Sequence, residues 1–89
     1  MDRQYQIKGD LDASYVARMR SEMEDLANSN GNVIMDLTNA EFVDSSGLGI
    51  LVFLHKRLTA AGRKLKVVGL RGQPLLLFTN LHLMPLFCE

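Results

Sequence analysis

Apolar residues recur at spacings that change along the chain and so predict alternating strands and helices. Arg3 to Lys8 alternates weakly between polar and apolar residues, which predicts a short strand ended by Gly9. Val33 to Thr38 is an apolar run broken by Asp36, typical of a central strand covered on both faces. Leu65 to Leu70 alternates and contains β-branched residues, which predicts a further strand.

Two other segments have the spacing of amphipathic or capped helices. From Ala13 to about Ser29, apolar residues recur three and four positions apart, and Asp12 is placed to cap the start. That apolar stripe consists of Val16, Met19, Met23 and Leu26. A later helix, from about Gln73 to Leu81, has Pro74 in its first turn, where the missing N–H of proline is not needed.

The stretch VDSSGLGILVFLH, Val43 to His55, is the segment around which we expect the rest of the chain to be arranged. It opens with three residues whose short side chains cap helix N-termini: Asp44, Ser45 and Ser46. A helix is therefore predicted near residues 46 to 61, with Gly62 placed to end it.

Two glycines lie inside this predicted helix. Each of Gly47 and Gly49 costs about 1 kcal/mol relative to alanine in a helix interior. We therefore expect that the backbone is approached closely there, either by packing within the chain or by a visiting group.

The C-terminal run LLLFTNLHLMPLF has little periodicity. We expect its larger apolar side chains to lie in the core, namely Leu75, Leu76, Leu77, Phe78 and Leu81. Asn80 or His82 is expected to end the helix, and Leu86 and Phe87 are expected to start a last short strand.

The order of these elements predicts an α/β fold in a single domain, residues 1–89. Strands that alternate with helices imply right-handed crossovers and a small, mainly parallel or mixed sheet, here of about four strands, with helices packed against it. Apolar residues make up 47% and charged residues 22% of the 89 residues, as in ordinary globular domains. The uncharged runs are too short to span a membrane and Met1 to Asp10 contains no signal-peptide core, so we expect a soluble, cytoplasmic protein without membrane association.

Charge is balanced in total and unequal between the halves. Residues 1–45 carry four basic and nine acidic side chains, whereas residues 46–89 carry six basic and one acidic. Because no concentrated basic stripe results, nucleic-acid binding is not expected, and partner proteins are the expected ligands.

Catalysis has little support in the sequence. A nucleophilic Ser45 or Ser46 would need a general base within hydrogen-bond distance. His55 lies ten residues after Ser45, about 15 Å along the same helix, which is too far for this role. The sequence does not exclude His82 as that base. Metal-ligand spacings, paired carboxylates and phosphate-binding glycine loops are not found, so we expect neither an enzyme nor a metal or cofactor. The single cysteine, Cys88, is interpreted as a packed or incidental thiol and not as a nucleophile.

A serine at a helix N-terminus can instead receive a phosphoryl group from another enzyme. The phosphate would face free N–H groups and the positive end of the helix dipole. The alternative is that the Asp-Ser-Ser run only caps the helix. Asp36 likewise has two interpretations: it accepts hydrogen bonds from its own loop, or it lies beside the Ser45 site.

The run LTNAEFVDSSGLGIL, residues 37–51, resembles the signature of STAS domains, and specifically of the bacterial anti-sigma factor antagonists. The resemblance extends from GDLDA, residues 9–13, to LLLFTNLHLMPLF, residues 75–87. It implies that Ser45 is phosphorylated by a partner anti-sigma factor that is itself an ATP-dependent serine kinase, and that a PP2C-type phosphatase reverses this. The unmodified protein would bind the anti-sigma factor and free the sigma factor.

The resemblance also assigns a partner-binding surface around the acceptor. Its residues are Asp36, Asp44, Ser46, Gly47, Leu48, Gly49 and Ile50. The protein is expected to be a monomer or a weak dimer, and shortened at both ends relative to the family. Asn80 stands where the family commonly has a left-handed glycine. The alternative function is a constitutive STAS subunit that braces the ATPase of an ABC lipid-transport system; an intact Asp-Ser-Ser-Gly favours the switch.

Overall fold

Three short parallel strands form the sheet of this protein. The computed structural model describes residues 2–87, so the interpretation of Cys88 lies outside the described residues. The strands are β1 (Arg3–Gln6), β2 (Val33–Asp36) and β3 (Leu65–Val68), in the order β1-β2-β3. Each begins where the sequence predicts and ends two residues earlier, because the chain bends into loops at the carboxyl ends. The described sheet has three strands where about four were expected.

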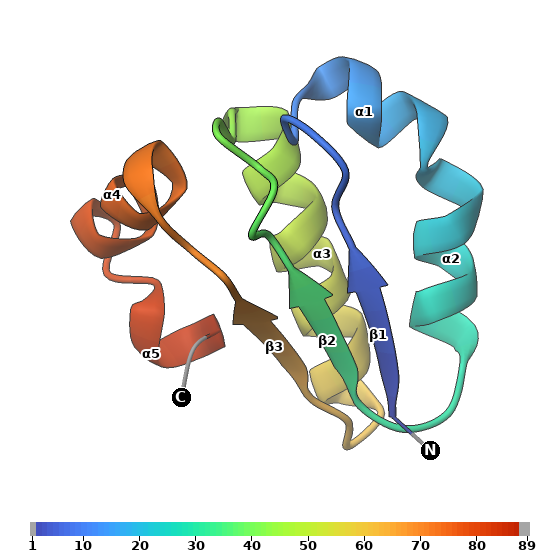
Figure 1. Ribbon diagram of the computed structural model, residues 1–89. Helices are drawn as coiled ribbons and strands as arrows, with labels where there is room; N and C mark the ends of the chain where they lie inside the picture. Colours follow the sequence, from blue (N-terminus) through green and yellow to red (C-terminus); the bar gives the residue numbers. More distant parts are fainter. Residues whose placement is uncertain (1, 88–89) are drawn as a thin grey trace.

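Five helices complete the fold in the described part of the chain (Figure 1). They are α1 (Ala13–Arg18), α2 (Arg20–Asn28), α3 (Ser45–Ala60), α4 (Gly72–Asn80) and α5 (Met84–Phe87). The predicted positions of α3 and α4 are confirmed to within one residue at each end. None of these helices is both long and apolar enough to cross a membrane.

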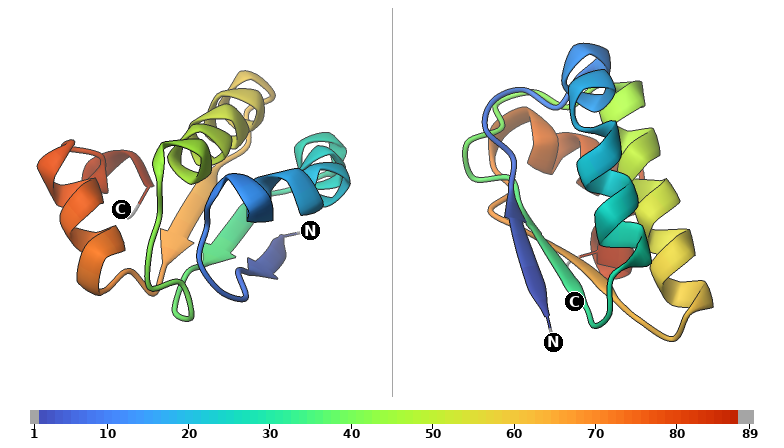
Figure 2. Two further views of the ribbon diagram at one scale, coloured as in Figure 1. Left: turned by 90° about the horizontal axis from the view of Figure 1, so that it is seen from above. Right: turned by 90° about the vertical axis from the view of Figure 1, so that its right-hand side faces the viewer.

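The helices lie on one side of the sheet, which leaves its other face without a helix over residues 2–87 (Figure 2). Buried side chains of the strands, such as Met35 and Val67, alternate with exposed or half-buried ones, such as Ile34 and Lys66. The expectation that β2 is covered on both faces is therefore wrong. Its outward side chain Ile34 is half-buried even though no helix lies over it.

The core lies between the sheet and the helices. Three leucines of α3 at helical spacing are fully buried: Leu51, Leu54 and Leu58. The predicted stripe of the first helical segment is confirmed, with Met19, Met23 and Leu26 buried and Val16 half-buried. The stripe therefore faces the sheet and α3.

The helix predicted from 13 to 29 is interrupted at Met19. Met19 has φ −101° and ψ 10°, which ends α1 and begins α2 after a single turn residue. The backbone hydrogen bonds continue through the break, because the Met19 N–H donates to Tyr15 O at 3.0 Å and Met19 O accepts from the Met23 N–H at 2.9 Å. The break changes the helix direction and leaves the apolar stripe unbroken (Figure 1).

The end of the chain differs from the expectation in two ways. The left-handed residue after α4 is His82, with φ 57°, and Asn80 is an ordinary last helical residue. The Leu83 N–H donates to Phe78 O at 2.9 Å and the His82 N–H to Thr79 O at 3.1 Å, a Schellman ending. The chain then enters α5, so the strand expected at Leu86 and Phe87 is wrong.

This turn decides which C-terminal side chains are buried. Phe87 packs against Phe78 with ring centroids 5.5 Å apart, and both are buried. Three leucines expected in the core are exposed instead: Leu75 by 37%, Leu76 by 62% and Leu81 by 49%. Phe78 and α5 occupy the inner side of α4, which leaves these leucines outward.

Candidate functional site: the N-terminus of helix α3

The candidate site lies at the carboxyl edge of the parallel sheet. Loops after β1, β2 and β3 leave this edge, and α3 begins there directly after the β2 loop (Figure 1). In open α/β sheets, ligands and partners commonly bind at this edge. The topology thus brings the Asp-Ser-Ser-Gly run to an accessible end of the molecule.

Asp44 is the residue that caps α3. Its Oδ1 accepts a hydrogen bond from the Gly47 N–H at 2.9 Å, and its Oδ2 accepts one from the Ala13 N–H at 3.3 Å. Ala13 is the first residue of α1, so one carboxylate joins the first turns of two helices. The Asp44 N–H donates to Leu11 O at 3.2 Å, which fixes its backbone as well.

Gly47 is required by close packing against the loop after β1. A Cβ added at this position would lie 2.1 Å from Leu11 O and 2.7 Å from Leu11 Cγ. The expectation of a close backbone approach is confirmed here. At Gly49 a Cβ would meet nothing within 4 Å, so no described part of the chain explains this second glycine.

The side chains of Ser45 and Ser46 do not cap the helix. Ser45 and Ser46 are both exposed, and within residues 2–87 neither hydroxyl takes part in a hydrogen bond. Ser45 is the first residue of α3, immediately after the capping carboxylate. A hydroxyl with this exposure is accessible to a modifying enzyme.

The loop before α3 is held by contacts that the sequence did not indicate. The Gln73 side chain accepts from the Val43 N–H at 2.8 Å and donates through Nε2 to Val43 O at 3.1 Å. Val43 is buried, whereas Phe42 is 45% exposed, so of these two apolar residues only Val43 joins the core. A glutamine in the first turn of this helix, directly before a mainly apolar run, was the one signal that could have pointed to this contact.

Asp36 belongs to the turn after β2. Its Oδ1 accepts from the Thr38 N–H at 2.9 Å and from the Thr38 hydroxyl at 2.6 Å. The Thr38 hydroxyl, followed by the backbone N–H, lowers the pKa of this carboxyl below its ordinary value. Among the described residues, the Asp36 carboxylate forms its hydrogen bonds with Thr38 and none with Ser45, which matches the loop-satisfying interpretation.

A partly apolar face of α3 begins at Ser46, next to Ser45. Ser46, Gly49, Ile50 and Phe53 recur at helical spacing; we call these four residues the exposed α3 face. Gly49 is exposed, Phe53 is 41% exposed and Ile50 is half-buried. Ile50 and Phe53 also border a shallow groove of about 140 Å³ against α1 and α2. Of the other predicted partner residues, Gly47 is buried and Leu48 half-buried.

Within residues 2–87, no group of three His, Cys, Asp or Glu side chains is placed to hold a metal ion.

The sequence matches the family model of the STAS domain over residues 2–88. The chain belongs to the STAS domain family. STAS domains are generally binding and regulatory domains without catalytic activity.

A solved structure supports the STAS fold. A sulfate transporter family protein from Wolinella succinogenes matches with a TM-score of 0.78 and 13% sequence identity, over 94% of this chain and 69% of that chain. At this identity the similarity concerns the fold alone. No curated protein gives a significant match to the sequence.

Proposed function

We propose that this STAS domain is an anti-sigma factor antagonist, a binding switch controlled by phosphorylation of Ser45. The observation that carries the proposal is the division of tasks at the start of α3. Asp44 caps the helix, so the exposed Ser45 hydroxyl is left without a hydrogen bond among the described residues. The exposed α3 face lies directly beside it and supplies apolar surface for a partner.

The fold is expected to tolerate the modification. A phosphate adds about 1.5 to 2 negative charges and gains about 0.3 to 1 kcal/mol from the helix N-terminus. The neighbouring Asp44 carboxylate repels it, which offsets part of that gain. Both effects are small against a domain stability of about 5 to 15 kcal/mol.

The phosphate is expected to weaken the complex between this domain and its partner. Burying a dianion against a partner without a matching cation costs several kcal/mol, and each 1.4 kcal/mol lowers the affinity about tenfold. Unmodified protein would therefore bind the anti-sigma factor kinase, and phosphorylated protein would be released. A PP2C-type phosphatase would restore the binding form.

The first test maps the phosphate. The protein is incubated with ATP and candidate serine kinases of the anti-sigma factor class from the same genome, and the modified residue is found by mass spectrometry. We expect phosphate on Ser45 in wild type and in Ser46→Ala, and none in Ser45→Ala. Phosphate on Ser46 with Ser45 untouched would overturn the assignment.

Binding is then titrated by calorimetry against the kinase that modifies Ser45. Ser45→Asp is expected to bind at least about tenfold more weakly than wild type while melting within a few degrees of it. Ser45→Ala is expected to bind as wild type does. Equal affinities for Ser45→Asp and wild type would refute the switch. If no kinase modifies Ser45, a constitutive subunit of an ABC lipid-transport system becomes the better explanation of the exposed face.

A further inference from the structure

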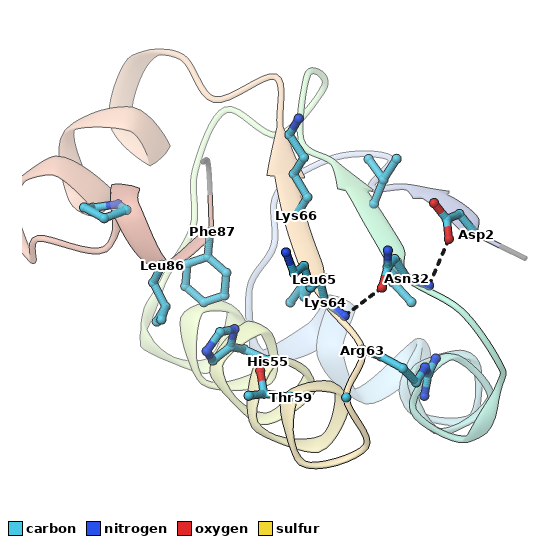
Figure 3. A pocket seen from close by; sticks show the side chains of 14 residues that line it. Asp2, Asn32, His55, Thr59, Arg63, Lys64, Leu65, Lys66, Leu86 and Phe87 are labelled. Atoms are coloured by element: carbon cyan, nitrogen blue, oxygen red, sulfur yellow. Dashed lines mark hydrogen bonds between the residues drawn. The ribbon is translucent and has the colours of Figure 1, made fainter.

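A second hollow lies near the end of α3 remote from Ser45. It is a cavity of about 600 Å³ beside β3, bordered by α3 and α5 (Figure 3). In the described sheet β3 pairs with β2 alone, so its other edge is free to border the cavity. This volume lies in the range of small-molecule sites, which run from about 300 to 1,000 Å³.

The cavity has an apolar part built from α5, α3 and β3. Figure 3 shows Phe87, Leu86 and His55 on one side and Leu65 on the other. Leu65 and Phe87 are buried, whereas Leu86 is 43% exposed at the opening. An apolar ligand body could therefore lie against side chains that the core already holds in place.

The His55 ring belongs to this wall. Its ring meets Phe87 edge to face, with centroids 5.4 Å apart and planes at 72°. Its Nδ1 is buried and has no hydrogen-bond partner among the described residues. Because this atom has almost no accessible surface, a ligand in the cavity would contact the rest of the ring and not Nδ1.

The charged side chains of the lining are mainly basic, and the other lining residues are apolar or uncharged. Lys64, Lys66 and Arg63 line the cavity, and Asp2 is the one acidic residue among the described lining residues, which leaves a formal charge of +2. The Arg63 guanidinium is engaged, because it donates to Gly31 O at 2.6 Å and to Ala27 O at 3.0 Å. Lys64 and Lys66 are exposed and supply positive charge at the opening.

We infer that this cavity binds a small amphiphilic anion, with its apolar body against Leu65, Leu86 and Phe87 and its acidic group reaching over the free edge of β3 to Lys64 and Lys66. The apolar wall and the basic rim together favour such a ligand over a neutral hydrocarbon or a bare inorganic anion. The chemistry is shared by a carboxylate and a phosphate monoester. The inference does not depend on the proposed function, because His55 lies about 15 Å along α3 from Ser45.

The test uses the full chain with sodium octanoate and octyl phosphate as probes, followed by backbone amide NMR shifts. We expect saturable shifts at Leu65, Lys66 and His55 with at least one of the two acids; the tighter one identifies the headgroup. Octanol and acetate should each bind at least about tenfold more weakly than that acid. Equal binding of octanol, or shifts confined to the first turn of α3, would overturn the proposal.

Two variants test the two parts of the site. Lys64→Gln combined with Lys66→Gln should weaken binding of the acid at least about fivefold, and Leu86→Ser should weaken it by a similar factor. The matched control is Lys56→Gln, an exposed lysine on α3 outside the cavity lining, which should bind as wild type does. No saturable shift with either acid, or the same loss in the control as in the double variant, would contradict the inference.

Discussion

Asp44 and Ser45 are neighbours with separate tasks. The Asp44 carboxylate accepts hydrogen bonds from the first turns of α3 and α1, and the exposed Ser45 hydroxyl accepts none from the described residues. Removing a cap of this kind costs about 0.5 to 2 kcal/mol. A phosphate on Ser45 would therefore be added without breaking a hydrogen bond of the described fold.

The turn after β2 allows a test of one side-chain hydrogen bond. Thr38→Val removes the hydroxyl that lowers the pKa of Asp36 most, so that pKa should rise toward its ordinary value. Because the folded-state pKa is lowered, Asp36 stabilises the fold at pH above its ordinary pKa, and this contribution is lost as the pH falls through the lowered value. The variant should therefore lose stability near neutral pH and less in acid.

An NMR titration of the Asp36 carboxyl carbon measures this directly. Thr79→Val, on the exposed side of α4, is the control and should leave the pKa of Asp36 unchanged. An unchanged value in Thr38→Val would mean that the Thr38 backbone N–H, and not the hydroxyl, holds the carboxylate.

Local contacts of the site could be predicted from sequence, and distant ones could not. The cap at Asp44 depends on residue types within one helical turn, which the sequence displays. A helical glycine indicated a close approach at Gly47, but only the structure identifies its partner, Leu11. Which of Asp44, Ser45 and Ser46 caps the helix depends on the residue at which the chain turns into the helix. The sequence does not give that residue, so all three were candidates. The hydrogen bonds between Gln73 and Val43 join residues 30 apart and exist only because α4 packs beside the loop.

At the scale of the element, the two glycines of α3 should respond in opposite ways to alanine. Gly47→Ala places a Cβ 2.1 Å from the Leu11 carbonyl oxygen, so the helix start or the loop must move and stability should fall by at least about 1 to 3 kcal/mol. Gly49→Ala meets no atom within 4 Å and should raise stability by up to about 1 kcal/mol. Chemical denaturation of the two variants measures both changes.

Gly49→Ala also bears on binding. If a partner approaches the backbone at Gly49, the stabilised variant should bind the Ser45 kinase more weakly than wild type. Unchanged affinity would mean that the space above Gly49 is not used. A loss of stability in Gly49→Ala would contradict the open environment described for this residue.

Helix boundaries and the C-terminal run show where periodicity stops being informative. The apolar stripe continues through Met19, so the spacing gave no sign that the helix breaks there. The run from Leu75 to Phe87 contains too many apolar residues for its spacing to separate a strand from a helix. Its outcome depends on Phe87 folding back onto Phe78, which only the packed structure reveals.

At the scale of the whole molecule, the α/β class and the parallel sheet followed from the order of the elements. The sequence did not indicate that helices cover only one face of that sheet. Val33 to Thr38 is apolar at nearly every position, which suggested helices on both faces. Outward residues such as Ile34 are half-buried on a face without a helix. A pattern that only separates apolar from polar residues assigns them to the core.

Two of the exposed apolar side chains in residues 2–87 have different parts in the proposed function. Phe53 lies on the exposed α3 face and is 41% exposed, whereas Leu76 lies on α4 and is 62% exposed. Because both side chains are already partly in water, a lysine at either position should change the melting temperature by only a few degrees. Only Phe53 shares a helix face with the residues beside Ser45.

We therefore expect Phe53→Lys to weaken binding to the Ser45 kinase at least about tenfold, and Leu76→Lys to leave it within about twofold of wild type. Calorimetric titrations with parallel thermal melts separate lost binding from lost stability. Because Arg57 lies over the Phe53 ring, 5.7 Å from its centroid, Phe53→Leu serves as the variant that removes this contact without adding charge. If Leu76→Lys lost as much affinity as Phe53→Lys, the partner would have to cover α4 as well, and the exposed α3 face would not be its main docking surface.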